Sequence, residues 1–220
     1  MIKFEHTNVH GIEAAMRGMR NPLMSHDKSD SRATPLELSE PYGFRAGPDD
    51  LDLALRLAKA GPEHAKYLRM ISVTVDITAP VYYLRELDTY KVGTTCNSSS
   101  MMHTGTVRDY ATFDFSVDTG YADYDNELLE DMKAVLEIVN KWRGRADRKT
   151  SSKLTLPAFR AMRQLMPMSY NYKITWAANY AVLRTIYHQR KGHALSEWSG
   201  KNGFCHWVEN LPYSGLITKE

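Results

Sequence analysis

The 220-residue sequence has few cysteines and no long apolar run. Cys96 and Cys205 are its two cysteines, too few for a disulfide framework and without the CxxC spacing of a zinc site. No apolar stretch reaches the roughly 18 residues that a membrane-spanning helix needs. Residues 1–6 lack the apolar core of a signal peptide, which predicts a cytoplasmic protein.

An excess of charge of one sign is also missing. Lysine plus arginine number 28 and aspartate plus glutamate number 26, which gives a net charge of +2. So balanced a chain does not favour binding to nucleic acid or to a membrane surface. The basic residues 141–153 are typical of a solvated face, and contact with nucleic acid is the alternative. A hydrophobic fraction of 43% with 25% charged residues is usual for a globular protein.

The phosphate-binding motifs of the common nucleotide folds are absent as well. Neither GxGxxG nor GxxxxGK[ST] occurs, so the sequence indicates neither a Rossmann dinucleotide site nor a P-loop. His188, His193 and His206 do not have the spacing of metal ligands, and we expect no metal site.

The patterns that are present predict one α+β domain over residues 1–220. Strands are expected at 3–7 and at 70–80, and in the second of them β-branched and polar residues alternate. Helices are expected at 11–20, 48–60, 80–89, 125–142, 156–166 and 175–191. Residues 25–47 are rich in Ser, Asp, Pro and Gly, and they predict either a lid or binding loop or a surface insertion.

Two arginines lie on otherwise apolar helical faces. One face, about 16 Å long, contains Asn179, Leu183, Ile186 and Arg190. Arg163 occupies a similar stripe on the preceding predicted helix. A buried guanidinium needs a carboxylate or a phosphate as a partner. Each arginine therefore either binds an anionic ligand, forms an internal salt bridge or extends past the core.

Residues 94–100 (TTCNSSS) cluster small hydroxyl side chains after a predicted helix. Backbone N–H groups and hydroxyls in such a segment can converge on an anion. An ordinary polar loop has the same composition. Cys96 has no base nearby in the sequence, and we interpret it as a small packing residue.

These segments together resemble the flavin-dependent thymidylate synthases over roughly residues 60–200. Residues 162–167 (MRQLMP) resemble the family's Ala-Arg-x-x-Leu-Pro, and residues 179–190 (NYAVLRTIYHQR) resemble its Asn-x-Arg-x-Leu-(x)6-Arg. Residues 193–198 (HALSEW) resemble the following His-Ala-Gln-Trp-Glu, with one residue missing before them. Residues 77–80 (ITAP) resemble the strand that precedes the family's signature.

The signature itself, Arg-His-Arg followed by Ser-x-Asn-Glu-x-Ser-x-Arg, is altered here. Asn97 and Ser100 align with the asparagine and the second serine of this signature. In that alignment Arg-His-Arg is replaced by Tyr90, Lys91 and Val92. The glutamate is replaced by Ser98, and the last arginine by Met102. Ala181 replaces an arginine of the later helix. In the family these residues hold flavin and nucleotide, so the changes put the standard reaction in doubt but not the fold.

The resemblance implies an antiparallel sheet packed by helices, in a homotetramer with sites between subunits. It also implies transfer of a one-carbon unit from methylenetetrahydrofolate to C5 of a pyrimidine deoxynucleoside monophosphate, dUMP to dTMP, with FAD that NADPH reduces. Two alternatives remain open. One is hydroxymethyl transfer to dUMP or dCMP for modified DNA, and the other is a non-catalytic nucleotide-binding relative.

The resemblance also implies a role for each matching residue. Arg190 and Ser100 are the expected catalytic residues. The expected substrate ligands are Arg163, Arg190, Ser98, Ser100 and Lys91, with Ser98 and Ser100 at the phosphate. The expected flavin ligands are Asn179, Asn97, Lys91 and Tyr90.

Overall fold

The computed structural model describes residues 2–34, 43–146 and 155–220 of the chain. The chain forms two compact units. Unit 1 comprises residues 1–3, 77–89 and 97–174, and unit 2 comprises residues 4–76, 90–96 and 175–220. Each strand of the main sheet has residues in both units.

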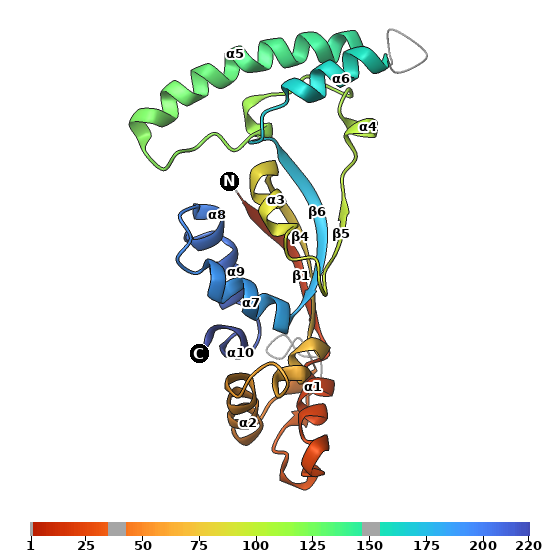
Figure 1. Cartoon of the computed structure of the whole chain (residues 1–220), viewed down its shortest axis with the longest axis vertical. Helices are drawn as coiled ribbons and strands as arrows, with labels where there is room; N and C mark the ends of the chain where they lie inside the picture. The colour runs from red at the N-terminus through yellow and green to blue at the C-terminus, as the bar shows by residue number, and fades with distance from the viewer. Residues whose placement is uncertain (1, 35–42, 147–154) are drawn as a thin grey trace. The chain divides into compact units, whose positions relative to one another are not determined.

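Four strands form the main antiparallel sheet in the order β1-β4-β6-β5 (Figure 1). Their bounds are Lys3–His10 for β1, Ser72–Pro80 for β4, Asn171–Asn179 for β6 and Thr95–Ser98 for β5. The predicted class, α+β with an antiparallel sheet packed by helices, is confirmed. A second, small sheet pairs β2 (Arg32–Ala33) antiparallel with β3 (Phe44–Arg45), with Ala33 opposite Phe44.

The strand predicted at 70–80 is confirmed as β4, where Val73, Val75 and Ile77 are buried at alternate positions. The helix predicted at 175–191 is wrong in its first five residues, which belong to β6. Trp176 and Ala178 are buried there, whereas the side chains of neighbouring residues are more exposed. This period of two is short, and a helix follows it directly, so the two patterns merge in the sequence.

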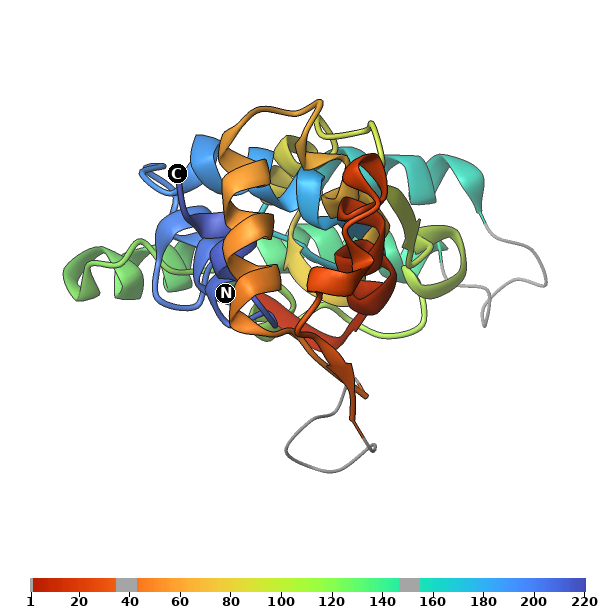
Figure 2. The same cartoon turned by 90° about the horizontal axis from the view of Figure 1, so that it is seen from below.

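Unit 2 contains mostly short helices. They are α1 Ile12–Met19, α2 Pro48–Lys59, α7 Tyr180–Arg190, α8 Ser196–Ser199, α9 Phe204–Glu209 and α10 Gly215–Thr218, with the 3-10 helices η1 Asn21–Leu23, η2 His26–Lys28 and η3 Ala65–Met70. The helices predicted at 11–20 and 48–60 are confirmed as α1 and α2, which are neighbours (Figures 1 and 2).

Gly11 precedes α1 with φ of 86°, and a Cβ there would lie 2.1 Å from the Met70 carbonyl oxygen, so this position requires glycine.

Unit 1 contains α3 Val81–Leu87, α4 Met101–Thr104, α5 Ala122–Ala146, α6 Leu156–Leu165 and the 3-10 helix η4 Thr112–Asp114. The helices predicted at 80–89, 125–142 and 156–166 are confirmed. Met132, Leu136 and Val139 of α5 share one apolar cluster with Phe159 and Met162 of α6, which lies alongside α5 (Figure 1).

The basic linker predicted at residues 141–153 is helical in its first part, because α5 continues to Ala146. Arg143 forms an ion pair with Asp109, with 2.5 Å between Nη2 and Oδ1. The guanidinium carbon of Arg145 lies 4.7 Å from the centroid of the Trp142 ring. These two charges therefore contact the protein itself, and residues 147–153 lie outside the described part of the chain.

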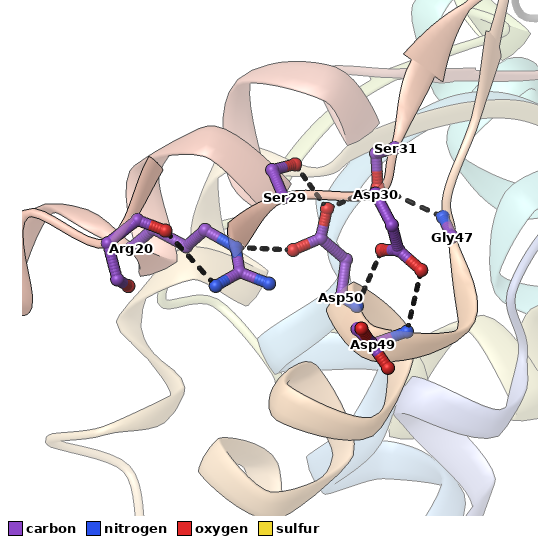
Figure 3. A network of polar contacts seen from close by, with 8 residues as sticks. Arg20, Ser29, Asp30, Ser31, Gly47, Asp49 and Asp50 are labelled. Atoms are coloured by element: carbon purple, nitrogen blue, oxygen red, sulfur yellow. Dashed lines mark hydrogen bonds and ion pairs between the residues drawn. The ribbon is translucent and has the colours of Figure 1, made fainter. Parts of the chain in front are cut away.

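Hydrogen bonds from Ser29 and Ser31 attach residues 25–34 to Asp50 of α2, which also forms a buried ion pair with Arg20 (Figure 3). Arg20 Nε lies 2.5 Å from Asp50 Oδ1, and the two side chains are 6% and 0% exposed. The hydroxyls of Ser29 and Ser31 donate to the other carboxylate oxygen. Burial alone would raise the pKa of Asp50, but the hydrogen bonds from Ser29, Ser31 and Arg20 outweigh burial and hold it below its usual range.

Asp30 caps the first turn of α2 from outside the helix. Its carboxylate accepts hydrogen bonds from the backbone N–H groups of Asp49 and Asp50, at 2.9 and 3.1 Å. A Cβ at Gly47 would lie 2.1 Å from the Asp30 carboxyl carbon, so glycine makes this approach possible. These contacts argue against a loose surface insertion for the described parts of residues 25–47, and residues 35–42 lie outside the description.

Candidate functional site

The predicted helical face that ends in Arg190 belongs to α7. The side-chain carbonyl of Asn179 accepts a hydrogen bond from the backbone N–H of Val182 at 3.1 Å and caps the first turn. Leu183 and Ile186 on this face are fully buried, whereas Asn179 and Arg190 at its two ends are half-buried. The face is therefore confirmed, with Asn179 as the cap of the helix.

Arg190 lies against two aromatic side chains at the end of α7. Its Nε donates a hydrogen bond to the hydroxyl of Tyr90 at 3.0 Å. Its guanidinium carbon lies 4.8 Å from the centroid of the Trp198 ring and 5.7 Å from that of Tyr90. The Tyr90 hydroxyl in turn donates to Gln189 Oε1 at 2.9 Å. The fold thus brings together two predicted site residues, Tyr90 and Arg190, that are 100 positions apart in the sequence.

The turn that follows Tyr90 packs against the start of α7. Gly93 has φ of 78°, and a Cβ at this position would lie 3.3 Å from Asn179 Nδ2. The hydroxyl of Thr94 donates to the Tyr90 carbonyl oxygen at 2.7 Å and closes the turn. Glycine lets the turn adopt its left-handed conformation close to Asn179. Lys91 in this turn is exposed, and its ammonium group can reach an anion in solution.

A cavity of about 410 Å³ lies beside α7. Ala181, Thr185 and Gln189 line it from α7, and Arg69 lines it from η3. Its volume is within the roughly 300–1,000 Å³ typical of small-molecule sites. Arg184 also lines the cavity, and its guanidinium donates to three backbone carbonyl oxygens near residue 220. The cavity therefore has a positive lining next to the position where the resemblance expects an arginine and this chain has Ala181.

Three further predicted site residues belong to unit 1 and lie at an edge of the main sheet. Asn97 and Ser98 are in β5, the last strand in the order, and Ser100 is the N-cap residue of α4. All three are exposed. Four residues of the segment 94–100, for which an anion-binding segment and a polar loop were the two interpretations, form strand β5. The backbone N–H of Ser99 continues the pairing with the carbonyl of Lys173 at 3.0 Å.

Arg163 is exposed, which corrects the expectation of a buried guanidinium. Phe159 and Met162 are buried on the inner face of α6, while Arg163 extends from the edge of this stripe, as long cationic side chains often do. Burial raises the pKa of Tyr172, and the nearby charge of Arg163 partly opposes this shift. Arg163 is thus placed to interact with a ligand or partner from solvent.

The sequence reasoning missed two residues of the Arg190 environment. Trp198 in α8 is fully buried, and its ring makes edge contacts with Tyr90 and His193 at centroid distances of 6.3 and 6.2 Å. Its signal was an aromatic residue shortly after Arg190 in a segment already quoted for the resemblance. Gln189 had no signal apart from its position next to Arg190.

The described ranges contain neither a metal-binding cluster nor a membrane-spanning helix. No three side chains of His, Cys, Asp and Glu there are grouped so that they can hold a metal ion. Each helix in the described part of the chain is too short or too polar to span a bilayer.

Comparison with known proteins shows which fold the chain has. No protein-family model matches the sequence, and no curated protein matches it. The fold is that of the flavin-dependent thymidylate synthases and of a related nucleotide methylase.

The particular structures that match cover almost the whole chain. Thymidylate Synthase X (ThyX) from Helicobacter pylori, in a crystal structure with FAD and dUMP, matches with a TM-score of 0.68 at 15% identity, over 100% of this chain and 96% of that one. The UMP/dUMP methylase PolB from Streptomyces cacaoi, bound with 5-Br dUMP, matches with a TM-score of 0.65 at 14% identity, over 97% and 93%. At these identities the likeness shows a shared fold.

Proposed function

We propose that this chain, as one domain of 220 residues, catalyses flavin-dependent transfer of a one-carbon unit to C5 of a pyrimidine deoxynucleotide in the cytoplasm. The substrate is dUMP and the product dTMP, with methylenetetrahydrofolate as carbon donor and NADPH as reductant of FAD. The observation that supports this most is the Arg190 environment. Tyr90 and Trp198 hold a guanidinium at one end of α7, and Asn179 caps the other end.

Arg190 is the proposed contact to the nucleotide. A guanidinium donates two parallel hydrogen bonds to a phosphate or a single one to a pyrimidine carbonyl, and such charge-assisted bonds are the strong ones. Ser100, Ser98 and Arg163 are proposed as further nucleotide contacts, with Ser100 at the phosphate. All three are exposed, which fits a site that a second subunit completes. We accordingly propose a homotetramer.

The residues around the start of α7 fit a flavin. Asn179 Oδ1 is used by the helix cap, while its Nδ2 points toward the Gly93 turn and remains a donor for a cofactor. Lys91 supplies a point charge from the same turn, and Tyr90 and Asn97 complete the proposed flavin ligands. The cavity beside Ala181 and Arg69 adds volume and positive charge for a phosphate-containing cofactor. When bound, FAD supplies the hydride, and the protein supplies orientation and electrostatic stabilisation.

The departure at Ala181 offers a gain-of-function test of this proposal. Ala181→Arg restores the arginine that the resemblance expects, in a cavity of suitable size, and should tighten FAD binding by about three- to tenfold. Ala134→Arg, at an exposed position of α5 in unit 1, is the matched control and should leave FAD affinity unchanged. FAD affinity is measured by flavin fluorescence quenching. A protein that binds no FAD in either form would contradict the flavin-dependent function.

A further inference from the structure

The guanidinium of Arg190, at the end of α7, makes contacts with two aromatic side chains. Its carbon lies 4.8 Å from the centroid of Trp198, a ring that is itself fully buried. Its Nε donates to the Tyr90 hydroxyl at 3.0 Å, and the Tyr90 ring lies 5.7 Å away. Tyr90 and Trp198 also contact each other edge to face, with ring centroids 6.3 Å apart.

Each of these contacts restricts a different degree of freedom. A ring beside the guanidinium fixes its distance and tilt, and tryptophan is the aromatic side chain that attracts a cation most strongly. A hydrogen bond at Nε fixes rotation within the plane. The Tyr90 hydroxyl cannot turn away easily, because its proton is donated to Gln189 at 2.9 Å. An arginine has many rotamers in solution, and their loss weakens binding unless they are already restricted.

We propose that Trp198 and Tyr90 are positioning residues, which orient the Arg190 guanidinium before the pyrimidine nucleotide binds. This inference rests on the proposed function and adds the device that gives Arg190 its orientation. Trp198 is fully buried and lies against Arg190, so its action on nucleotide binding is exerted through Arg190. Tyr90 has the same action through its hydroxyl and its ring. The predicted consequence is a nucleotide affinity that depends on both side chains only while Arg190 is present.

The test measures dUMP affinity by titration calorimetry for Tyr90→Phe and Trp198→Phe, with melting temperature on the same samples. Tyr90→Phe removes the hydroxyl and keeps the ring, and Trp198→Phe keeps a weaker ring in the same place. We expect each to weaken dUMP binding by about three- to tenfold. Trp198→Phe also lowers the melting temperature because the ring is buried, so melting temperature alone does not decide.

Two matched controls lie elsewhere in the chain. Tyr187→Phe removes a tyrosine hydroxyl of α7, which donates to Glu209 at 2.8 Å. Trp142→Phe weakens another arginine contact, that of Arg145 at 4.7 Å. Both should leave dUMP affinity unchanged within about twofold. A loss of affinity in the controls equal to that in the site variants would overturn the inference.

A double-mutant cycle with Arg190→Ala separates positioning from direct contact. If Tyr90 and Trp198 act through Arg190, Tyr90→Phe and Trp198→Phe cause no further loss of affinity in the Arg190→Ala background. Additive losses, or single variants with wild-type affinity, overturn the inference and leave the proposed function intact. A wild-type protein that binds neither dUMP nor dCMP refutes the proposed function, and the inference with it.

Discussion

Asp50→Asn is expected to lower the stability of the fold strongly. Asp50 is fully buried, and one of its oxygens faces Arg20 while the other accepts from Ser29 and Ser31 (Figure 3). Asparagine has the same shape but one oxygen and no charge. It can serve either Arg20 or the two serines, and the Arg20 guanidinium remains buried without a counter-charge.

The magnitude follows from the burial of the pair. Removing one partner of a buried ion pair costs about 3–5 kcal/mol, because the other charge stays buried. In a chain of this size each kcal/mol lowers the melting temperature by about 2–4 °C, so we expect a decrease of about 6–20 °C. Asp52→Asn is the control on the same helix. Its pair with Arg56 is 68% exposed on both sides, and losing it should cost less than about 0.5 kcal/mol.

The assay is thermal unfolding of the wild type and the variants, followed by circular dichroism at pH 7. A third variant, Asp50→Asn with Arg20→Met, removes the uncompensated charge and should be more stable than Asp50→Asn alone. If Asp50→Asn and Asp52→Asn lower the melting temperature equally, the buried Asp50 carboxylate stabilises the fold no more than an exposed one, which refutes this reasoning.

Three further predictions concern pH, binding and assembly. The pKa values of Asp50 and Asp114 are lowered in the folded state, so the stability that these carboxylates give the fold is complete above about pH 4 and is lost as the pH falls below that. Chemical unfolding at a series of pH values should show this decline in stability, and Asp50→Asn should make the decline smaller. Arg190→Ala should weaken dUMP binding by about ten- to a hundredfold in calorimetry with little change in melting temperature, and Arg190→Lys should restore little; normal affinity in Arg190→Ala would exclude this role. Sedimentation at micromolar concentration should show a tetramer, with Val135 and Ile138, exposed on α5, as candidates for the interface, and a clean monomer would contradict shared sites.

The fold was predictable from the sequence where one period dominates a long segment. The alternation that gives β4 and the apolar stripe that gives α5 are of this kind. The error at Thr175 has a physical reason, because β6 leads directly into α7 and only the Asn179 cap marks the change. Local periodicity carries no information about such a transition.

The candidate site was predictable only in part, because its contacts are long-range. The motif at residues 179–190 identified Asn179 and Arg190, and the altered signature identified Tyr90. The hydrogen bond between Tyr90 and Arg190 joins residues 100 positions apart, which no spacing rule predicts. Trp198 was missed for the same reason, since its role depends on which side chain its ring lies against.

The central claim is flavin-dependent modification of a pyrimidine nucleotide at C5, and product analysis tests it most directly. The purified protein is incubated with FAD, NADPH, methylenetetrahydrofolate and either dUMP or dCMP, and the nucleotides are analysed by mass spectrometry. We predict conversion of dUMP to dTMP that requires flavin and folate together; a product with one additional oxygen, or one formed from dCMP, would indicate hydroxymethyl transfer or the other base. No product from either nucleotide, or a product formed equally well without flavin, would contradict the claim.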